Sequence, residues 1–203
     1  MTSAPARRGR PGYDQRTLLD VAAAVFNERG YDGTSMEDLS RRLGITKSAI
    51  YHHVDSKAEL LRLGLDRALD GLFAVVADVD AAGGQAIDRL EALMRGSVRV
   101  LAAELPFVTL LLRVRGNTDV ERAALARRRE FDRIVARLVE QAQADGDVRA
   151  DVDPAVASRL LFGMVNSLVE WYRPRGTAGD HGDIADAVVT IAFDGMRASG
   201  RKR

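Results

Sequence analysis

The sequence of 203 residues predicts an all-α protein with about nine helices. Alternating strand patterns are absent, whereas apolar residues recur at helical spacing along most of the chain. Ala, Leu and Arg, which are good helix formers, dominate the composition. A hydrophobic fraction of 46% beside 29% charged residues is a globular balance with enough apolar side chains for a core.

The composition also excludes several classes of function. The chain has no cysteine, so disulfides, thiol catalysis and cysteine metal sites are excluded. No apolar run approaches the roughly 18 residues of a membrane helix, and no signal peptide is recognisable, so we expect a cytoplasmic protein. No phosphate-binding loop, Gly-x-Ser-x-Gly elbow or His-Glu-x-x-His motif occurs. We therefore expect no enzyme, with no catalytic residue, no metal site and no cofactor.

Capping residues and glycines delimit the helices of the first third of the chain, after a basic arm over residues 1–12. Asp14 is the expected N-cap of the first helix, and Gly30 is its expected stop. Thr34 and Glu37 have capping-box spacing for the second helix. The predicted helices of this N-terminal domain, residues 13–57, cover about 14–29, 34–43 and 46–54.

Six further helices are expected in residues 58–203, which we assign to a second domain. Ser56 and Glu59 form another capping box at the start of its first helix. Pro106 must interrupt the helical pattern because proline lacks a backbone donor, and Asp153 before Pro154 is typical of an N-cap followed by the first helical residue. The expected helices cover about 56–80, 85–105, 107–115, 118–144, 154–172 and 183–198.

Residues 34–57 are the stretch that carries a function. Two short helices are separated by a glycine-centred turn of about four residues, which is the spacing of a helix-turn-helix. Leu39 and Leu43 are expected to pack on Ile45 and Ile50, which leaves the other face of the second helix free. The turn and the second helix contain no acidic residue, so nothing there repels phosphates. A helix of this width fits the DNA major groove, with its N-terminal residues at the base edges.

These residues resemble the signature of the TetR family of transcriptional regulators. The resemblance rests on two blocks, Gly44–Lys57 (GITKSAIYHHVDSK) and Ala23–Leu39 (AAVFNERGYDGTSMEDL), and it covers about residues 14–60. Val54 stands where the family often has phenylalanine, and it keeps an apolar plug. The family fold that this implies is an N-terminal helix-turn-helix domain followed by a helical ligand-binding and dimerisation domain.

The resemblance also implies a set of DNA contacts. Those implied at base edges are Lys47, Ser48, Ala49 and His52. Those implied at phosphates, which fix the register without reading sequence, are Thr34, Ser35, Tyr51, His53 and Lys57. Thr46 completes the predicted set, and Arg7, Arg8 and Arg10 of the arm are candidates for further contacts. Two alternatives stay open, since Tyr51 can pack on the first helix and His53 can bond a carbonyl in the interior.

A homodimer is expected because one recognition helix reads only a few base pairs. The family builds its dimer from the last two helices, and Gly163 and Ser167 would allow two backbones to approach closely. The alternative is that the apolar residues of these helices form the core of one chain. The predicted interface consists of Leu160, Leu161, Gly163, Met164, Ser167, Leu168, Val188 and Ile191.

A ligand cavity in the second domain is a further implication of the family, although plain core is the alternative for each of its walls. Residues 166–176 resemble those of TetR regulators that respond to acyl-CoA thioesters, with Trp171 against an acyl group or adenine and Arg173 and Arg175 on phosphates. The alternative is that Trp171 packs the helix end while the arginines cap it. The predicted walls are Met94, Val98, Leu101, Phe107, Leu111, Phe131, Val135, Phe162, Asn166, Trp171 and Arg175.

The sequence therefore predicts a ligand-responsive transcriptional regulator. We expect it to bind palindromic operator DNA as a homodimer, to act as a repressor as the family usually does, and to be released by a small effector such as an acyl-CoA thioester. One alternative is an effector of a different kind, a drug-like or other apolar molecule. An alternative from another class is a protein-interaction module that keeps the helix-turn-helix as a scaffold, which salt-dependent binding to duplex DNA would distinguish.

Overall fold

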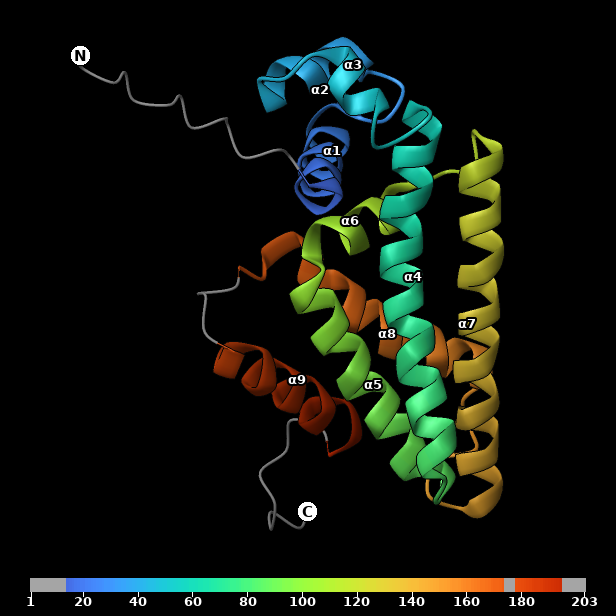
Figure 1. Ribbon diagram of the computed structural model, residues 1–203. Coiled ribbons are helices and arrows are strands. Elements are labelled where there is room, and N and C mark those ends of the chain that lie inside the picture. The colour runs from blue at the N-terminus through green and yellow to red at the C-terminus, as the bar shows by residue number, and fades with distance from the viewer. Residues whose placement is uncertain (1–13, 174–177, 195–203) are drawn as a thin grey trace, which may run out of the picture. The chain divides into compact units, whose positions relative to one another are not determined.

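The computed structural model describes residues 14–173 and 178–194, and all regular elements of this part are helices (Figure 1). The predicted all-α class is confirmed. The chain divides into two compact units, residues 1–61 and 62–203, and one helix runs from the first into the second. The helices are α1 (Gln15–Arg29), α2 (Met36–Leu43), α3 (Lys47–Tyr51), α4 (Lys57–Ala82), α5 (Ala86–Ala103), α6 (Leu105–Arg113), α7 (Asp119–Asp145), α8 (Pro154–Trp171) and α9 (Ala178–Phe193).

Helix α1 has the predicted boundaries. The Asp14 side chain accepts a hydrogen bond of 2.8 Å from the Thr17 N–H, which satisfies one of the free donors of the first turn. Gly30 ends the helix with φ 79°, a conformation that favours glycine. The helix buries Leu18 and Phe26 in the core of the first unit.

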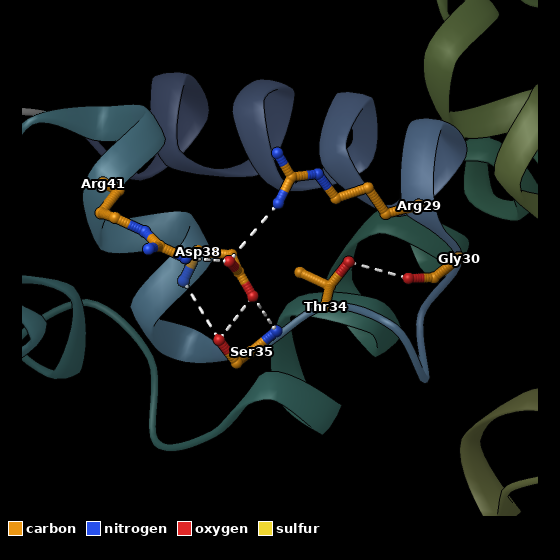
Figure 2. Close-up of polar contacts among 6 residues, drawn as sticks. All are labelled: Arg29, Gly30, Thr34, Ser35, Asp38 and Arg41. Atoms are coloured by element: carbon orange, nitrogen blue, oxygen red, sulfur yellow. Dashed lines mark hydrogen bonds and ion pairs between the residues drawn. The ribbon is translucent and has the colours of Figure 1, made fainter.

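Helix α2 begins with a capping box one residue later than the sequence predicts (Figure 2). The Ser35 Oγ accepts from the Asp38 N–H at 3.2 Å, and the Asp38 carboxylate accepts from the Ser35 N–H at 2.9 Å. The prediction of Thr34 and Glu37 as the box is therefore wrong. Thr34 is instead 2% exposed, and its hydroxyl donates to the Gly30 carbonyl at 2.8 Å, because this threonine closes the turn after α1.

Helix α3 is shorter than predicted and ends at Tyr51 instead of near Val54. The N–H groups of His53 and Val54 both donate to the Ile50 carbonyl, at 2.9 and 3.2 Å, which closes a tight turn. This turn brings Val54, 3% exposed, into the core, so the chain cannot continue as a helix on the same axis.

The second unit is a bundle in which α5 packs against α7, α8 and α9. Helices α4 and α5 approach closely, since a Cβ added at Gly96 would lie 2.3 Å from a Val75 methyl group. Arg127 of α7 also holds α4 through ion pairs of 3.0 Å to Asp66 and 2.7 Å to Asp70. In the described part of the chain no helix is long and apolar enough to cross a membrane.

The predicted boundaries of this unit fit with one clear exception. Pro106 lies in the first turn of α6, where its missing N–H leaves no bond unmade. The Asp153 side chain caps α8 by accepting from the N–H groups of Ala155 and Val156 at 2.9 and 3.1 Å, as predicted. Helix α9 begins at Ala178, earlier than the predicted residue 183, because glycine weakens a helix by only about 1 kcal/mol and does not have to end it.

Candidate nucleic-acid interface and internal cavity

Helix α3 is seated by one apolar side chain and leaves its other face open. Ile50 is 0% exposed and packs with the buried Leu39 and Leu43 of α2. Ala49 is half-buried beside them. The predicted DNA-contacting residues on the exposed side are Thr46, Lys47, Ser48, Tyr51, His52 and His53.

The turn between α2 and α3 is fixed by local bonds. Gly44 adopts a left-handed conformation with φ 66°, which a side chain would strain. The Ser40 hydroxyl donates to the Ile45 carbonyl at 2.6 Å, and the Thr46 Oγ caps α3 by accepting from the Ala49 N–H at 3.2 Å. These bonds set the angle at which the free face of α3 is presented.

Lys47, the first residue of α3, has an ion pair on the same face. Its Nζ lies 2.6 Å from the Glu37 carboxylate of α2, and both side chains are about half exposed. The hydrogen bond between them lowers the pKa of Glu37 and raises the pKa of Lys47. Because an exposed pair contributes little to stability, a DNA phosphate or base can compete with Glu37 for this ammonium group.

The start of α2 is held by a second charged cluster, centred on Asp38 (Figure 2). The Ser35 hydroxyl donates to the Asp38 carboxylate at 2.6 Å, and the guanidinium groups of Arg41 and Arg29 also contact it. The bonds from Ser35, followed by that from Arg41, hold the pKa of Asp38 well below its usual range. Ser35 is exposed as expected, but its one hydroxyl proton is engaged by Asp38, so a phosphate would have to displace this bond.

Two of the predicted phosphate contacts have interior roles. Thr34 is buried, as described above, and its side chain cannot reach a phosphate. The Lys57 Nζ donates to the carbonyls of Tyr31 at 2.9 Å and Thr34 at 2.8 Å, and it lies 4.1 Å from the centre of the Tyr31 ring. Lys57 therefore fastens the start of α4 to the loop between α1 and α2. The structure corrects the expectation for Thr34, whereas the half-buried Lys57 uses two of its three donors in these bonds and stays a predicted phosphate contact.

A small cavity in the second unit brings together five of the eleven predicted ligand walls. It has a volume of about 40 Å³ and lies between α4, α5, α6, α7 and α8. The aromatic rings of two of its walls pack edge to face, since the ring centroid of Phe131 lies 5.2 Å from that of Phe162. The Phe131 ring centroid also lies 6.3 Å from that of Phe73 in α4. The predicted residues that line it are Leu101, Leu111, Phe131, Phe162 and Asn166.

The other predicted walls lie elsewhere. Trp171 is 58% exposed, so its prediction as a wall is wrong. The Arg173 guanidinium donates to the carbonyls of Tyr172 at 2.8 Å and Glu170 at 3.3 Å, which caps the end of α8 and favours the alternative considered for it. The residues buried in the core away from the cavity are Met94, Val98, Phe107 and Val135. Arg175 and the arm with Arg7, Arg8 and Arg10 lie outside the described residues.

Three polar residues of this cavity were missed by the sequence reasoning. Ser97 lines it from α5, while Arg128 and Asp132 line it from α7. Desolvation raises the pKa of Asp132, and the nearby Arg128 and Arg159 act in the opposite direction. No motif marks these residues, since a serine or an arginine within a helical pattern is ordinary.

A face of α8 with exposed apolar residues contains three of the eight residues predicted for the dimer interface. Leu160 is 67% exposed, and Gly163 and Ser167 are exposed on the same face. Val156 (47%) and Trp171 (58%) extend this face along the helix, which we call the α8 face. Ile191 of α9 is 45% exposed, and Leu161 and Met164 are half-buried. A groove of about 550 Å³ lies beside the α8 face, and the predicted interface residues that line it are Leu160, Leu161, Met164 and Ile191.

Two predicted interface residues belong to the core of their own chain. Leu168 is 1% exposed and Val188 is 5% exposed. They lie on the side of their helices that packs inward, so they have no surface to offer a second copy.

A recognition helix anchored by its apolar side, with its other face open, in a chain that also has a separate helical unit, defines the class of helix-turn-helix regulators. Residues 18–63 match the family model of bacterial regulatory proteins of the tetR family. Residues 83–196 match the model of the tetracyclin repressor-like C-terminal domain. The chain therefore belongs to the TetR family.

Three similar proteins support the assignment to this family. The HTH-type transcriptional repressor KstR2 of Rhodococcus jostii (strain RHA1) is 31% identical over 97% of this chain and 98% of its own length. The crystal structure of SCO3833, a TetR regulator from Streptomyces coelicolor A3, has a TM-score of 0.84 and 54% identity over 98% of this chain and 96% of that one. AibR, solved with isovaleryl coenzyme A and operator DNA, has a TM-score of 0.72 and 28% identity over 88% of this chain and 97% of its own. The chain is a DNA-binding transcriptional repressor of the TetR type and not an enzyme.

Proposed function

We propose that this repressor binds its operator as a homodimer and releases it when a small effector enters the second unit. The observation that carries the DNA-binding part is the geometry of α3. Ile50 is fully buried, while Lys47, Ser48 and His52 are exposed together. A helix anchored in this way can enter the major groove without disturbing its own domain.

The proposed contacts on this surface differ in kind. Lys47, Ser48 and His52, with the half-buried Ala49, would meet base edges, while the exposed Tyr51, His53 and Thr46 would contact phosphates and fix the register. Ser35 remains a candidate only if its bond to Asp38 is exchanged for one to a phosphate. Thr34 drops out of the set because it is buried and bonds to Gly30. Lys57 would contact a phosphate through the third donor of its ammonium group.

The DNA-binding surface is tested first on random-sequence duplex, because the phosphate contacts do not require the operator. We expect the affinity to fall steeply with salt concentration in the wild type. Lys47→Gln should weaken binding and make the dependence on salt shallower, whereas Arg133→Gln, which removes an exposed charge from α7, should change neither. Salt-independent binding, or equal effects of both substitutions, would favour the interaction-module alternative.

The homodimer proposal rests on the α8 face. Three large apolar side chains, Val156, Leu160 and Trp171, are exposed in one row of α8, and such a patch is typical of an interface. Its members recur at intervals of three or four residues from Val156 to Trp171, so they share one side of the helix. The exposed Gly163 at the middle of this row lets a second helix come close.

An acyl-CoA thioester is the effector that we propose. The support comes from similarity, since AibR was solved with isovaleryl coenzyme A and operator DNA, and from the cavity with mostly apolar walls that five of the predicted residues line. Helix α4 supplies a route for the signal, because it begins in the first unit at Lys57 and its later turns line the cavity at Leu72.

The effector is tested with operator fragments recovered by selection from genomic DNA. Band shifts with acetyl, isovaleryl and longer acyl-CoA esters should show release by at least one of them, with free coenzyme A as the control. Release by an apolar molecule without coenzyme A would favour the alternative effector. Unchanged DNA affinity across the whole panel would refute the thioester proposal and leave the DNA-binding surface untouched.

A further inference from the structure

Ser97 of α5 carries a buried hydroxyl with no hydrogen-bond partner among the described residues. The residue is 1% exposed, and its Oγ is inaccessible. Serines of α8 behave differently, since Ser158 and Ser167 donate to the carbonyls of Ala155 and Met164 at 3.0 and 2.7 Å. A buried hydroxyl without a partner is unfavourable, so the lack of a partner at Ser97 calls for a physical reason.

The reason lies in the cavity that Ser97 lines. Three of its apolar walls, Leu101, Phe131 and Val165, are each at most 3% exposed. The volume of about 40 Å³ gives room for one group of the size of a water molecule beside the hydroxyl. A single ligand oxygen would satisfy the Ser97 hydroxyl there, and the carbon atoms bonded to that oxygen would contact the apolar walls.

Other residues that line the cavity are polar or less deeply buried. Asn166 and Arg128 are half-buried and Asp132 is exposed, while Leu72 and Leu112 are half-buried. The half-buried leucines can move aside more easily than the fully packed walls.

We infer that Ser97 is the residue that selects the effector, by hydrogen bonding a neutral carbonyl or hydroxyl oxygen carried on an apolar body. This inference rests on the proposed function in taking the cavity as the effector site. It goes further in naming the chemistry of the group that Ser97 binds. An apolar body without such an oxygen would leave Ser97 unsatisfied and would bind less tightly.

The experiment compares two probes of nearly equal shape, 1-indanone, which has a carbonyl oxygen, and indane, which lacks it. Their dissociation constants are measured by methyl NMR titration of the full chain without DNA. We expect the wild type to prefer indanone by two- to tenfold, which is the value of one hydrogen bond. Ser97→Ala should abolish this preference, and Ser158→Ala, which removes a buried hydroxyl outside the cavity, should keep it.

The controls make each outcome decisive. Thermal unfolding should show Ser97→Ala to be at least as stable as the wild type, because the substitution removes a hydroxyl that has no partner. Equal affinities for both probes in the wild type, an unchanged preference in Ser97→Ala, or no binding of either probe at its solubility limit would overturn the inference. A structural water on Ser97 gives one of these three results. Since no DNA is present, such a failure leaves the proposed repressor function standing, and a failure of the thioester panel leaves this inference standing.

Discussion

Replacing Leu160 by alanine should weaken the proposed homodimer. Leu160 is 67% exposed on the α8 face. Fully burying a leucine stabilises by about 1.5–3 kcal/mol, so covering this exposed part contributes about 1–2 kcal/mol per copy. A two-fold interface contains the residue twice, and the substitution therefore weakens association by about 2–4 kcal/mol. This corresponds to a dissociation constant that rises by roughly 30- to 700-fold.

Sedimentation equilibrium of the full chain over a range of concentrations measures this change directly. The matched control is Tyr51→Ala, since Tyr51 is also an exposed large side chain, at 49%, but lies in the first unit. The control should dimerise like the wild type. If Leu160→Ala associates as tightly as Tyr51→Ala, the α8 face does not form the interface, and the argument from its exposure is refuted.

Four further expectations concern stability and DNA affinity. Ser35→Ala removes the N-cap of α2 and should lower the free energy of unfolding in urea by about 1 kcal/mol. A loss below about 0.3 kcal/mol would contradict the role of Ser35 as a cap. Because the pKa of Asp38 is lowered, its stabilising charge is fully present above its unfolded pKa of about 4 and is lost as the pH falls below it; Ser35→Ala should flatten this acid dependence. Gly96→Ala places a Cβ against Val75 and should destabilise by about 1–3 kcal/mol, measured by the melting curve. Glu37→Gln frees the lysine of α3 and should tighten binding to random duplex with a salt slope steeper by about one, whereas an unchanged slope would mean that the ion pair does not compete with DNA.

The fold could be predicted well where its signals are local. Asp14, Gly30, Gly44 and Asp153 each end or begin a helix through bonds to residues within four positions, and such bonds depend little on the rest of the chain. The start of α2 was misplaced by one residue because Thr34 and Ser35 are neighbours and both can cap. Burial of Thr34 in the turn after α1 decides between them, and burial is a tertiary property.

The candidate site was predicted only in part, for a related reason. Helical spacing shows that α8 has apolar residues on more than one side, but it does not tell which side meets the protein's own core. Leu168 turned out to face inward and Leu160 outward. Ser97 gives no signal in the sequence at all, because what distinguishes it is the absence of a neighbouring acceptor among the described residues. That property depends on five helices coming together.

The two bonds from Lys57 to the loop after α1 have a mechanical meaning for a repressor. They fasten the first turn of α4 to the loop between α1 and α2, so a rotation of that turn would carry the loop along with it. Under the proposed release by an effector, the helix-turn-helix would then not have to unfold in order to leave DNA. Amide hydrogen exchange in α1 to α3 should accordingly stay slow when an effector lowers the affinity for the operator.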